Sequence, residues 1–332
     1  MTYNFSALSR AMTAQDMASY RAKYIKKVST HSKIITGIFI ALGLIGLVIF
    51  IIPQMIAGRV SVSLLVIIAV AAVIGFLAVL GVMGRRKKLA RLYAFALDNN
   101  VKLIVDQSNP TYPGIIFTQG HSRSILEALV FPNGHEIGNY TYSTGSGKSR
   151  RTYNWGYMRV KLVRKLPHMV LDARKNNLFG SGVSSLPTTL TKDQVMRLEG
   201  NFNEYFTLYA PKGYERDALY VFTPDVMSAL IDYGASHDIE VVDDSLIFYQ
   251  KYSVNLMKEE SLKKYLTILD KVSSEIIDQG DYYADERVGN RAMDMIAAPG
   301  QRLRSRMSIV TVIFIIAFIA YFIWTFFQGS FS

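Results

Sequence analysis

The sequence predicts an α+β protein: a strand-rich cytoplasmic domain with flanking amphipathic helices, anchored by three transmembrane helices. Three observations support this fold class. Two adjoining apolar runs and a third near the C-terminus are each about as long as the roughly 20 residues that cross a bilayer as a helix. Segments rich in β-branched and aromatic residues lie between these runs, separated by turn residues. An amphipathic helical pattern covers residues 258–279.

The chain therefore divides into segments with different environments. In chain order we expect a basic cytoplasmic helical segment at 1–33, a transmembrane hairpin of two helices at 34–83, a cytoplasmic α+β domain at 84–301 with a sub-boundary near 179–190, and a third transmembrane helix at 308–328.

The first segment has helical composition over residues 5–32, with no proline or glycine and many alanine, methionine and basic residues. Two interpretations are open. The segment lies as an amphipathic helix on anionic lipid, or it packs as a helix on the cytoplasmic domain. The apolar face consists of Leu8, Met12, Met17, Tyr20, Tyr24 and Val28.

The apolar run of residues 34–83 contains no acidic residue and one base, Arg59. Pro53 and the polar residues that follow it interrupt the run near its middle. We expect two antiparallel spans, at about 34–57 and 61–83, joined by a turn that places Arg59 among the headgroups. After the second span, the helical pattern continues from Leu89 to Asn99.

The net charge of +11 is concentrated next to the predicted spans. Residues 89–301 hold 23 basic and 25 acidic residues, so this domain has no duplex-binding face and we expect no nucleic-acid partner. Anionic headgroups are the expected partner of the basic clusters. The candidate membrane-contact residues beside the spans are Arg85, Arg86, Lys87, Lys88, Arg302, Arg304 and Arg306.

The same charges predict the topology. Basic residues flank the entry and exit of the hairpin and the approach to the third span, which places the N-terminus and the main domain in the cytoplasm. The chain is then a multi-pass protein of the cell (inner) membrane, with residues 328–332 outside.

The central domain begins with a predicted strand at 101–107, followed by two strands around the turn of Pro132, Asn133 and Gly134. Two further strands are expected at 151–165 and 168–174. In the second half, strands at 239–242 and 245–252 are expected to form a hairpin around Asp243, Asp244 and Ser245. Residues 216–234 are expected to be helical, with a cap at Thr223 and Pro224 in a first turn.

Aromatic residues are concentrated on the two strands that flank residues 143–152. They alternate within each strand, so each strand places its aromatic side chains on one face. We favour core or cross-strand packing over a partner-facing or headgroup-facing patch. The set comprises Tyr140, Tyr142, Tyr153, Trp155 and Tyr157.

No motif assigns a reaction. The GSGKS sequence at 145–149 has Tyr142 where a phosphate-binding loop needs its first glycine, so it is read as a hairpin loop. The chain contains no cysteine, which excludes disulfides and cysteine-ligated zinc. The five histidines lack metal-ligand spacing. We therefore expect no metal site and no cofactor, and assign no catalytic or ligand-binding residue.

The loop 143–152 carries Lys148, Arg150 and Arg151 with no nearby acid. These three bases are further membrane-contact candidates, because a glycine-containing loop of a tethered domain could reach anionic headgroups.

Several stretches between residues 90 and 255 resemble an uncharacterised family of bacterial membrane proteins, the domain of unknown function 3137. They are FALDNN before a strand, the tyrosine-rich pair GNYTYSTG and RRTYNWGYMRV, LPHMVLDAR, and the stretch from LEGNFNEYF to VFTPDVMSALID. The resemblance implies a membrane protein and supplies no activity.

The functional hypothesis is a membrane-anchored, cytoplasmic-facing binding or scaffold module that is not an enzyme. Besides lipid, its partner would be another protein or a second copy of the chain. The alternatives are a membrane enzyme with an unrecognised site, which a pocket gathering carboxylates or His168 would favour, and a component of an oligomeric transport assembly.

Overall fold

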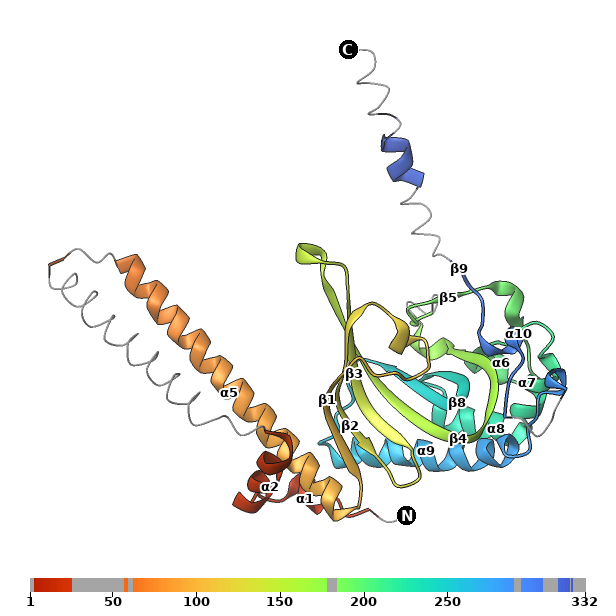
Figure 1. Ribbon diagram of the computed structural model, residues 1–332, viewed down its shortest axis with the longest axis horizontal. Helices are drawn as coiled ribbons and strands as arrows, with labels where there is room; N and C mark the ends of the chain where they lie inside the picture. The colour runs from red at the N-terminus through yellow and green to blue at the C-terminus, as the bar shows by residue number, and fades with distance from the viewer. Residues whose placement is uncertain are drawn as a thin grey trace. The chain divides into compact units, whose positions relative to one another are not determined.

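The computed structural model describes residues 3–25, 57–58, 62–177, 184–289, 294–306, 316–322 and 324. The chain divides into two compact units, Met1–Asn99 and Asn100–Ser332 (Figure 1). Nearly all of the predicted first span, 34–57, and most of the third, 308–328, lie outside the described residues.

The first unit is built on one long helix with two short helices packed against it. Its elements are α1 (Ser6–Ser9), α2 (Ala14–Tyr24) and α5 (Val62–Asp98). The expectation of one continuous helix over residues 5–32 is wrong, because the helix is interrupted after Ser9. Thr13 and Asp16 form a capping box that starts α2, and Arg10 binds the Asp16 carboxylate at 2.6 Å.

The helix α5 has exposed apolar residues in its first part and buried apolar residues in its second part. The large apolar side chains of Val66, Val70 and the stretch from Val73 to Met83 are exposed, and Arg85, Arg86 and Lys87 then follow on the surface. After this cluster Leu89, Leu92 and Phe95 are buried. The helices α1 and α2 pack against α5, and the rings of Phe5 and Tyr24 contact Phe95 and Tyr93 in its second half.

Contacts within the first unit bear on the two interpretations of residues 5–32. Leu8 and Tyr20 are buried, and the rings of Phe5 and Phe95 stack at 5.6 Å. Asn4 and Asn99 exchange two hydrogen bonds, of 2.6 and 2.9 Å. The described part of the N-terminal segment is therefore packed against α5.

Among the described residues, none of the helices combines the length and apolar character that crossing a membrane requires. The structure thus gives no support to the anchor of three transmembrane helices predicted from the sequence.

The second unit is an α+β domain built on a large antiparallel sheet. Its strands are β1 (Lys102–Ser108), β2 (His121–Val130), β3 (Glu136–Thr144), β4 (Arg151–Ala173), β5 (Thr189–Leu190), β6 (Val195–Met196), β7 (Phe206–Tyr209), β8 (Asp238–Lys251) and β9 (Ser305–Arg306). Its helices are η2 (Ile116–Thr118), η3 (Gly147–Ser149), η4 (Arg174–Asn176), η5 (Lys192–Gln194), α6 (Phe202–Tyr205), α7 (Glu215–Val221), α8 (Pro224–Ala229), η6 (Leu230–Gly234), α9 (Glu259–Gly280), η7 (Glu286–Val288) and α10 (Ala298–Gln301).

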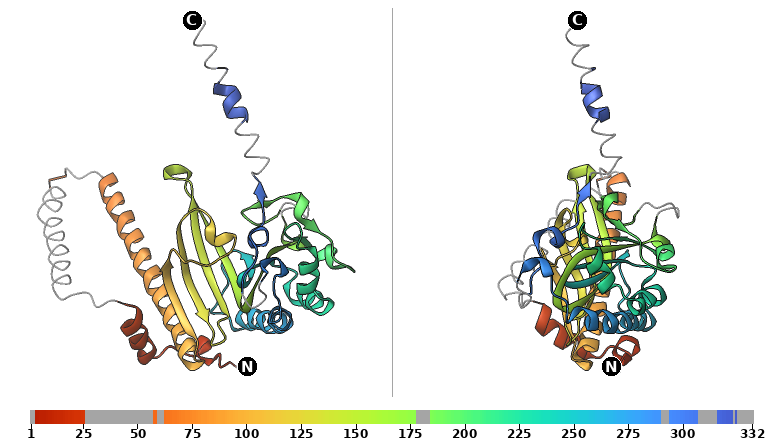
Figure 2. Two further views of the ribbon diagram at one scale, coloured as in Figure 1. Left: turned by 45° about the vertical axis from the view of Figure 1, so that its right-hand side comes forward. Right: turned by 90° about the vertical axis from the view of Figure 1, so that its right-hand side faces the viewer.

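Seven strands form the main sheet in the order β1-β2-β3-β4-β7-β6, with β8 also paired to β4. The 23-residue strand β4 organises this sheet. Its first part pairs with β3 and β8, and its last part pairs with β7 and β8. The sheet is strongly curved, and α9 lies across it (Figure 2).

The strand β4 is continuous where two strands were predicted. Pro167 lies in its interior and has no N–H to donate to a ladder. The register with β8 shifts on both sides of Leu166, between Lys161 and Met169. The proline is therefore accommodated at an irregularity, and the strand does not end there.

The hairpin predicted around Asp243 is also wrong. The residues from Asp238 to Lys251 form one strand, and Asp243 takes a left-handed conformation with φ of 50° inside it. Asp243 lies opposite Leu166, where the register of β4 shifts. Because β4 offers a continuous partner edge, β8 continues through a bulge and does not turn back.

Other elements agree with the sequence. The predicted strands at 101–107 and around residues 132–134 are β1, β2 and β3. Thr223 caps α8 with Pro224 in its first turn. The amphipathic helix is α9, and four residues of its predicted stripe are buried: Leu262, Leu269, Val272 and Ile276.

The tyrosine-rich strands supply the core, as favoured from the sequence. Tyr140, Tyr142, Trp155 and Tyr157 are buried, while Tyr153 is partly exposed and stacks on Tyr142 at 5.1 Å between ring centroids. Tyr140 lies opposite Trp155 in the register of β3 and β4. The set therefore stabilises the sheet by cross-strand packing.

Candidate functional site

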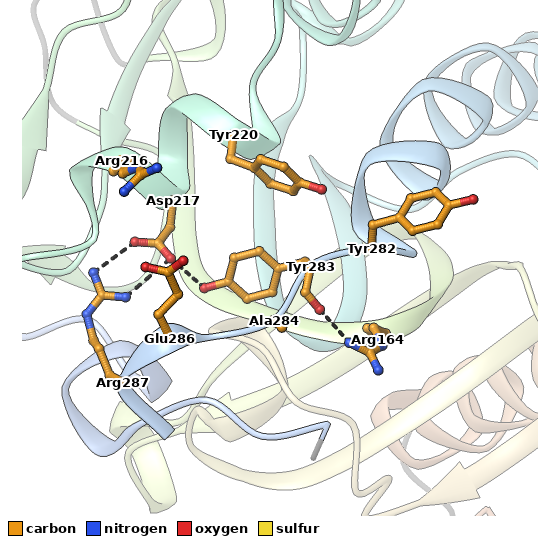
Figure 3. Close-up of a pocket in the computed structure, with 9 residues that line it drawn as sticks. All are labelled: Arg164, Arg216, Asp217, Tyr220, Tyr282, Tyr283, Ala284, Glu286 and Arg287. Atoms are coloured by element: carbon orange, nitrogen blue, oxygen red, sulfur yellow. Dashed lines mark hydrogen bonds and ion pairs between the residues drawn. The ribbon is translucent and has the colours of Figure 1, made fainter. Parts of the chain in front are cut away.

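A surface cleft of about 730 Å³ lies where α7 and the segment after α9 meet β4 (Figure 3). Its lining is rich in arginine and tyrosine and includes two carboxylates. The lining residues are Arg164, Arg216, Asp217, Tyr220, Tyr282, Tyr283, Ala284, Glu286 and Arg287.

Turns and caps in the local sequence position these side chains around the cleft. The helix α9 ends at Gly280, and the backbone N–H of Tyr283 donates to the Gly280 carbonyl in a turn that exposes Tyr282. Asp285 then caps η7 by accepting the N–H of Arg287 at 3.0 Å. A turn between Pro211 and Tyr214, with Gly213 at φ of 81°, starts α7 on the opposite wall.

Arg287 joins the two walls. Its guanidinium donates to the Asp217 carboxylate at 2.9 Å and to the Asp285 carboxylate at 3.1 Å. It also lies over the Tyr214 ring, 3.8 Å from the centroid. These contacts hold α7 and η7 together, since one planar guanidinium with several donors satisfies both carboxylates.

Hydrogen bonds keep the Asp285 carboxylate beside Arg287 ionised. Burial acts to raise the pKa of Asp285, but the Ala297 N–H, the Tyr214 hydroxyl and the Arg287 side chain hold that pKa below its ordinary value. The Tyr214 hydroxyl donates to Asp285 at 2.7 Å, and burial together with that carboxylate raises the pKa of Tyr214. This side of the site is thus a structural ion network.

The polar groups at the floor of the cleft are also paired by hydrogen bonds. The Tyr283 hydroxyl donates to the Asp217 carboxylate at 2.7 Å, and burial raises the pKa of Tyr283. Arg164 donates to the Tyr283 carbonyl oxygen at 2.8 Å. In Figure 3 the Tyr283 ring points toward Asp217, whereas the Tyr282 ring points away from it.

The rim of the cleft carries exposed side chains that are available to bind a partner. The Tyr282 side chain is 84 % exposed and that of Tyr220 is 40 % exposed. Arg216 is also exposed and, within the described part of the chain, has no hydrogen-bond or ion-pair partner. Tyrosine and arginine are the residue types enriched in the energetic centres of protein interfaces. The rim is therefore suited to recognition, with Arg216 and the remaining donors of Arg164 available to a carboxylate.

His168, singled out as a mark of an enzyme, lies outside the cleft. Its Nε2 is 2.7 Å from a Glu240 carboxylate oxygen, and its Nδ1 accepts the Leu303 N–H at 2.8 Å. Glu240 also accepts the N–H of Ile115 at 2.7 Å. This buried network fastens the C-terminal part of the unit to the sheet, which gives His168 a structural role.

The predicted membrane-contact residues lie in different environments. Arg302 pairs with Asp243 at 2.8 Å, Arg304 pairs with Asp193, and Arg306 belongs to β9 beside β5. Lys148, Arg150 and Arg151 lie at the projecting tip of the β3–β4 hairpin, which points toward the same end of the second unit as β9 (Figures 1 and 2). Arg85, Arg86, Lys87 and Lys88 form one turn of α5 in the first unit.

The sequence did not predict the cleft, because its residues come from three distant segments. One signal was present: the stretch from Asp281 to Arg287 places two tyrosines among four charged residues. Among the described residues, no three histidine, cysteine, aspartate or glutamate side chains gather as a metal site.

Comparisons with family models, with curated proteins and with solved structures find no match to this chain. The fold and the cleft therefore define it by class: an α+β protein with a curved antiparallel sheet and an arginine- and tyrosine-lined surface cleft.

Proposed function

We propose that this chain is a membrane-anchored binding module whose second unit recognises a partner protein at the cytoplasmic face of the cell membrane. The observation that carries the proposal is the exposed apolar surface that Val66, Val70 and the stretch from Val73 to Met83 form on α5, directly followed by a basic turn. Water exposure of so many large apolar side chains is unfavourable, and a bilayer would cover them.

The sequence around α5 supports the same proposal. The run of residues 34–83 is long enough for two spans, and 308–328 for a third. The basic cluster beginning at Arg85 would then lie in the cytoplasmic headgroups, where each base contributes about 1 kcal/mol.

Single cysteines test the anchor, because the chain has none of its own. Leu77 and Leu97 lie on α5 on either side of the basic cluster and are similarly exposed, at 59 % and 57 %. A membrane-impermeant maleimide should label Leu97→Cys in inverted membrane vesicles and not in intact cells. Leu77→Cys should react in neither, because a thiol in hydrocarbon does not form the reactive thiolate.

Both cysteines should react after the membrane is dissolved and the protein denatured, which controls for the intrinsic reactivity of each site. If Leu77→Cys reacts in vesicles as fast as Leu97→Cys, the apolar part of α5 is in water and the anchor proposal is wrong. If Leu97→Cys reacts in intact cells, the proposed sidedness is wrong.

We assign the partner-binding role to the cleft because its rim combines the exposed rings of Tyr220 and Tyr282 with Arg216. The partner would present a carboxylate to Arg216 and an apolar or aromatic side chain to the tyrosines. Truncating a residue at the energetic centre of an interface costs about 2 kcal/mol or more of binding energy.

A photo-crosslinking amino acid at Tyr282 in living cells tests this assignment. It should give a discrete protein adduct that is lost when Arg216→Glu is added. The matched control position is Tyr252, an exposed tyrosine outside the cleft, which should not give this adduct. The same adducts from both positions, or an adduct that persists with Arg216→Glu, would exclude the cleft as the binding site.

A further inference from the structure

Two carboxyl groups are buried together at one end of the sheet, away from the cleft. Asp172 is the penultimate residue of β4 and Asp238 is the first residue of β8. The neighbouring residues Leu171 and Ile239 are partners in the ladder between these strands. The side chains are almost completely removed from solvent, with exposed fractions of 4 % for Asp172 and 0 % for Asp238.

The pKa values of the two carboxyl groups reflect their burial and their proximity to each other. Burial raises the pKa of both carboxyls, and the neighbouring Asp238 raises the pKa of Asp172 further, to about 7. Two carboxylates can coexist in such a place only if a proton or a cation lies between them. The other groups that act on them are hydroxyls, amides and one backbone N–H. Tyr249 is a further titratable group near Asp238.

The surroundings of the pair consist of oxygen-bearing side chains. Asp238 accepts the Ala173 N–H at 2.9 Å and the Ser185 hydroxyl at 2.5 Å. The side chains of Asn176 and Ser184 face the pair from the segments next to β4. The Asn177 side chain faces Asp172, and its residue is only 9 % exposed.

The pair has more acceptors than donors. Three buried oxygens at this place, Asp172 Oδ1, Asn176 Oδ1 and Asn177 Oδ1, have no hydrogen-bond partner among the described residues. A buried acceptor without a partner costs about 1–3 kcal/mol. The amide groups of Asn176 and Asn177 donate to the carboxyls in this structure, and rotation of each amide about its terminal bond would turn its oxygen toward an ion held between the carboxylates.

We propose that Asp172 and Asp238, together with the side-chain oxygens of Asn176 and Asn177, bind a hard divalent cation, Ca²⁺ or Mg²⁺. Two carboxylates balance its double charge, and carboxylate and amide oxygens are the ligands that such ions take. Ser184 and Ser185 add hydroxyl oxygens beside them. The ion fastens the residues around Ser185 and the start of β8 to the end of β4.

The proposal is tested on the full-length chain in detergent, first treated with EDTA and then supplied with CaCl₂ or MgCl₂ at pH 7.5. Thermal unfolding should shift upward by roughly 5 °C or more at saturating cation. Titration calorimetry should give one ion per chain. Both effects should decrease at pH 5.5, because the proton on Asp172 competes with the ion.

The variant Asp172→Asn should lose the thermal shift and at least tenfold in cation affinity. Without cation it should unfold at the same or a higher temperature than the wild type, because one of two buried like charges is gone. Asp278→Asn, which changes an exposed aspartate on α9, should keep the full response.

A response to only one of the two salts identifies the ion. The proposal is overturned if the wild type shows neither a shift nor a heat of binding at pH 7.5, in which case the pair holds a proton only. It is equally overturned if Asp172→Asn retains the response, or if NaCl at matched ionic strength reproduces it.

Discussion

At the scale of single residues, His237 is a buried ionisable group with no role in the cleft. Burial, and then the positive charge of Lys264, lower the pKa of His237 to about 4. Its ring lies between those of Phe248 and Tyr265, at centroid distances of 6.3 and 6.5 Å. The native state therefore keeps the imidazole neutral at pH values where an unfolded chain protonates it.

This difference predicts a loss of stability in acid. Between pH 6.5 and pH 4 the unfolded chain binds a proton at His237 that the native state does not bind, so stability falls as pH falls through this window. The loss from this residue is about 3 kcal/mol. Urea unfolding of His237→Gln should show a shallower decline than the wild type over the same range.

The matched control is His121→Gln, which makes the same change at an exposed histidine and whose pH profile is compared with that of His237→Gln. Asp172 contributes an opposite slope, since its raised pKa favours the native state at low pH, but this contribution is common to all three proteins and cancels. An identical pH profile for His237→Gln and the wild type would contradict the prediction.

Arg287 is the residue on which the cleft wall depends. Arg287→Ala leaves Asp285, whose side chain is fully buried, and Asp217 without their guanidinium. We expect a loss of about 2 kcal/mol in the free energy of unfolding, below the value for a fully buried pair because Arg287 is partly exposed. Urea unfolding measures it, and Arg216→Ala should change stability by less than about 0.5 kcal/mol. Equal effects of the two variants would mean that the network does not stabilise the wall.

At the scale of elements, the sheet depends on close approach between β2, β3 and β4. Gly138 on β3 lies opposite Ala128 on one side and Tyr157 on the other. A Cβ at position 138 would be 2.6 Å from the Ala128 Cβ and 2.8 Å from the Tyr157 hydroxyl oxygen. Only glycine fits there without a shift of one strand.

Gly138→Ala should therefore lower the free energy of unfolding by about 1–3 kcal/mol through overpacking of the sheet. The matched control is Gly280→Ala at the end of α9, where the nearest atom to a new Cβ is 3.9 Å away. Denaturant unfolding of both variants measures the difference. A neutral Gly138→Ala would show that Ala128 and Tyr157 can move away from β3 without cost.

At the scale of the whole molecule, the tip of the β3–β4 hairpin is a second candidate contact with lipid. It carries Lys148, Arg150 and Arg151, and Tyr153 is partly exposed beside it. Three bases near an anionic surface contribute on the order of 3 kcal/mol at low salt, and less as screening increases.

A dye on Ser146→Cys should report this contact in the full chain reconstituted in nanodiscs. Its emission should shift to the blue in anionic nanodiscs, not in neutral ones, and the shift should decrease with added salt. Replacing Lys148, Arg150 and Arg151 by serine should abolish it. An unchanged shift in the triple variant would mean that the three bases do not hold the tip at the bilayer.

The sequence by itself determined the features that arise from local periodicity. The stripe from Leu262 to Ile276 defined α9, and the alternating aromatic residues of β3 and β4 predicted their core packing. These predictions were right because each residue's environment follows from its neighbours three or four positions away in a helix, or two in a strand.

Only the tertiary structure decided which distant residues meet. In the folded chain β4 continues past Pro167 and β8 continues past Asp243. Each strand provides the other with a continuous edge for pairing, and this pairing outweighs the local tendency of each of these residues to end a strand. The tertiary structure also brings Arg164, Asp217 and Tyr283 to one cleft, and buries Asp172 beside Asp238. No local sequence pattern predicts these contacts, because they are determined by strand pairing and helix packing between distant parts of the chain.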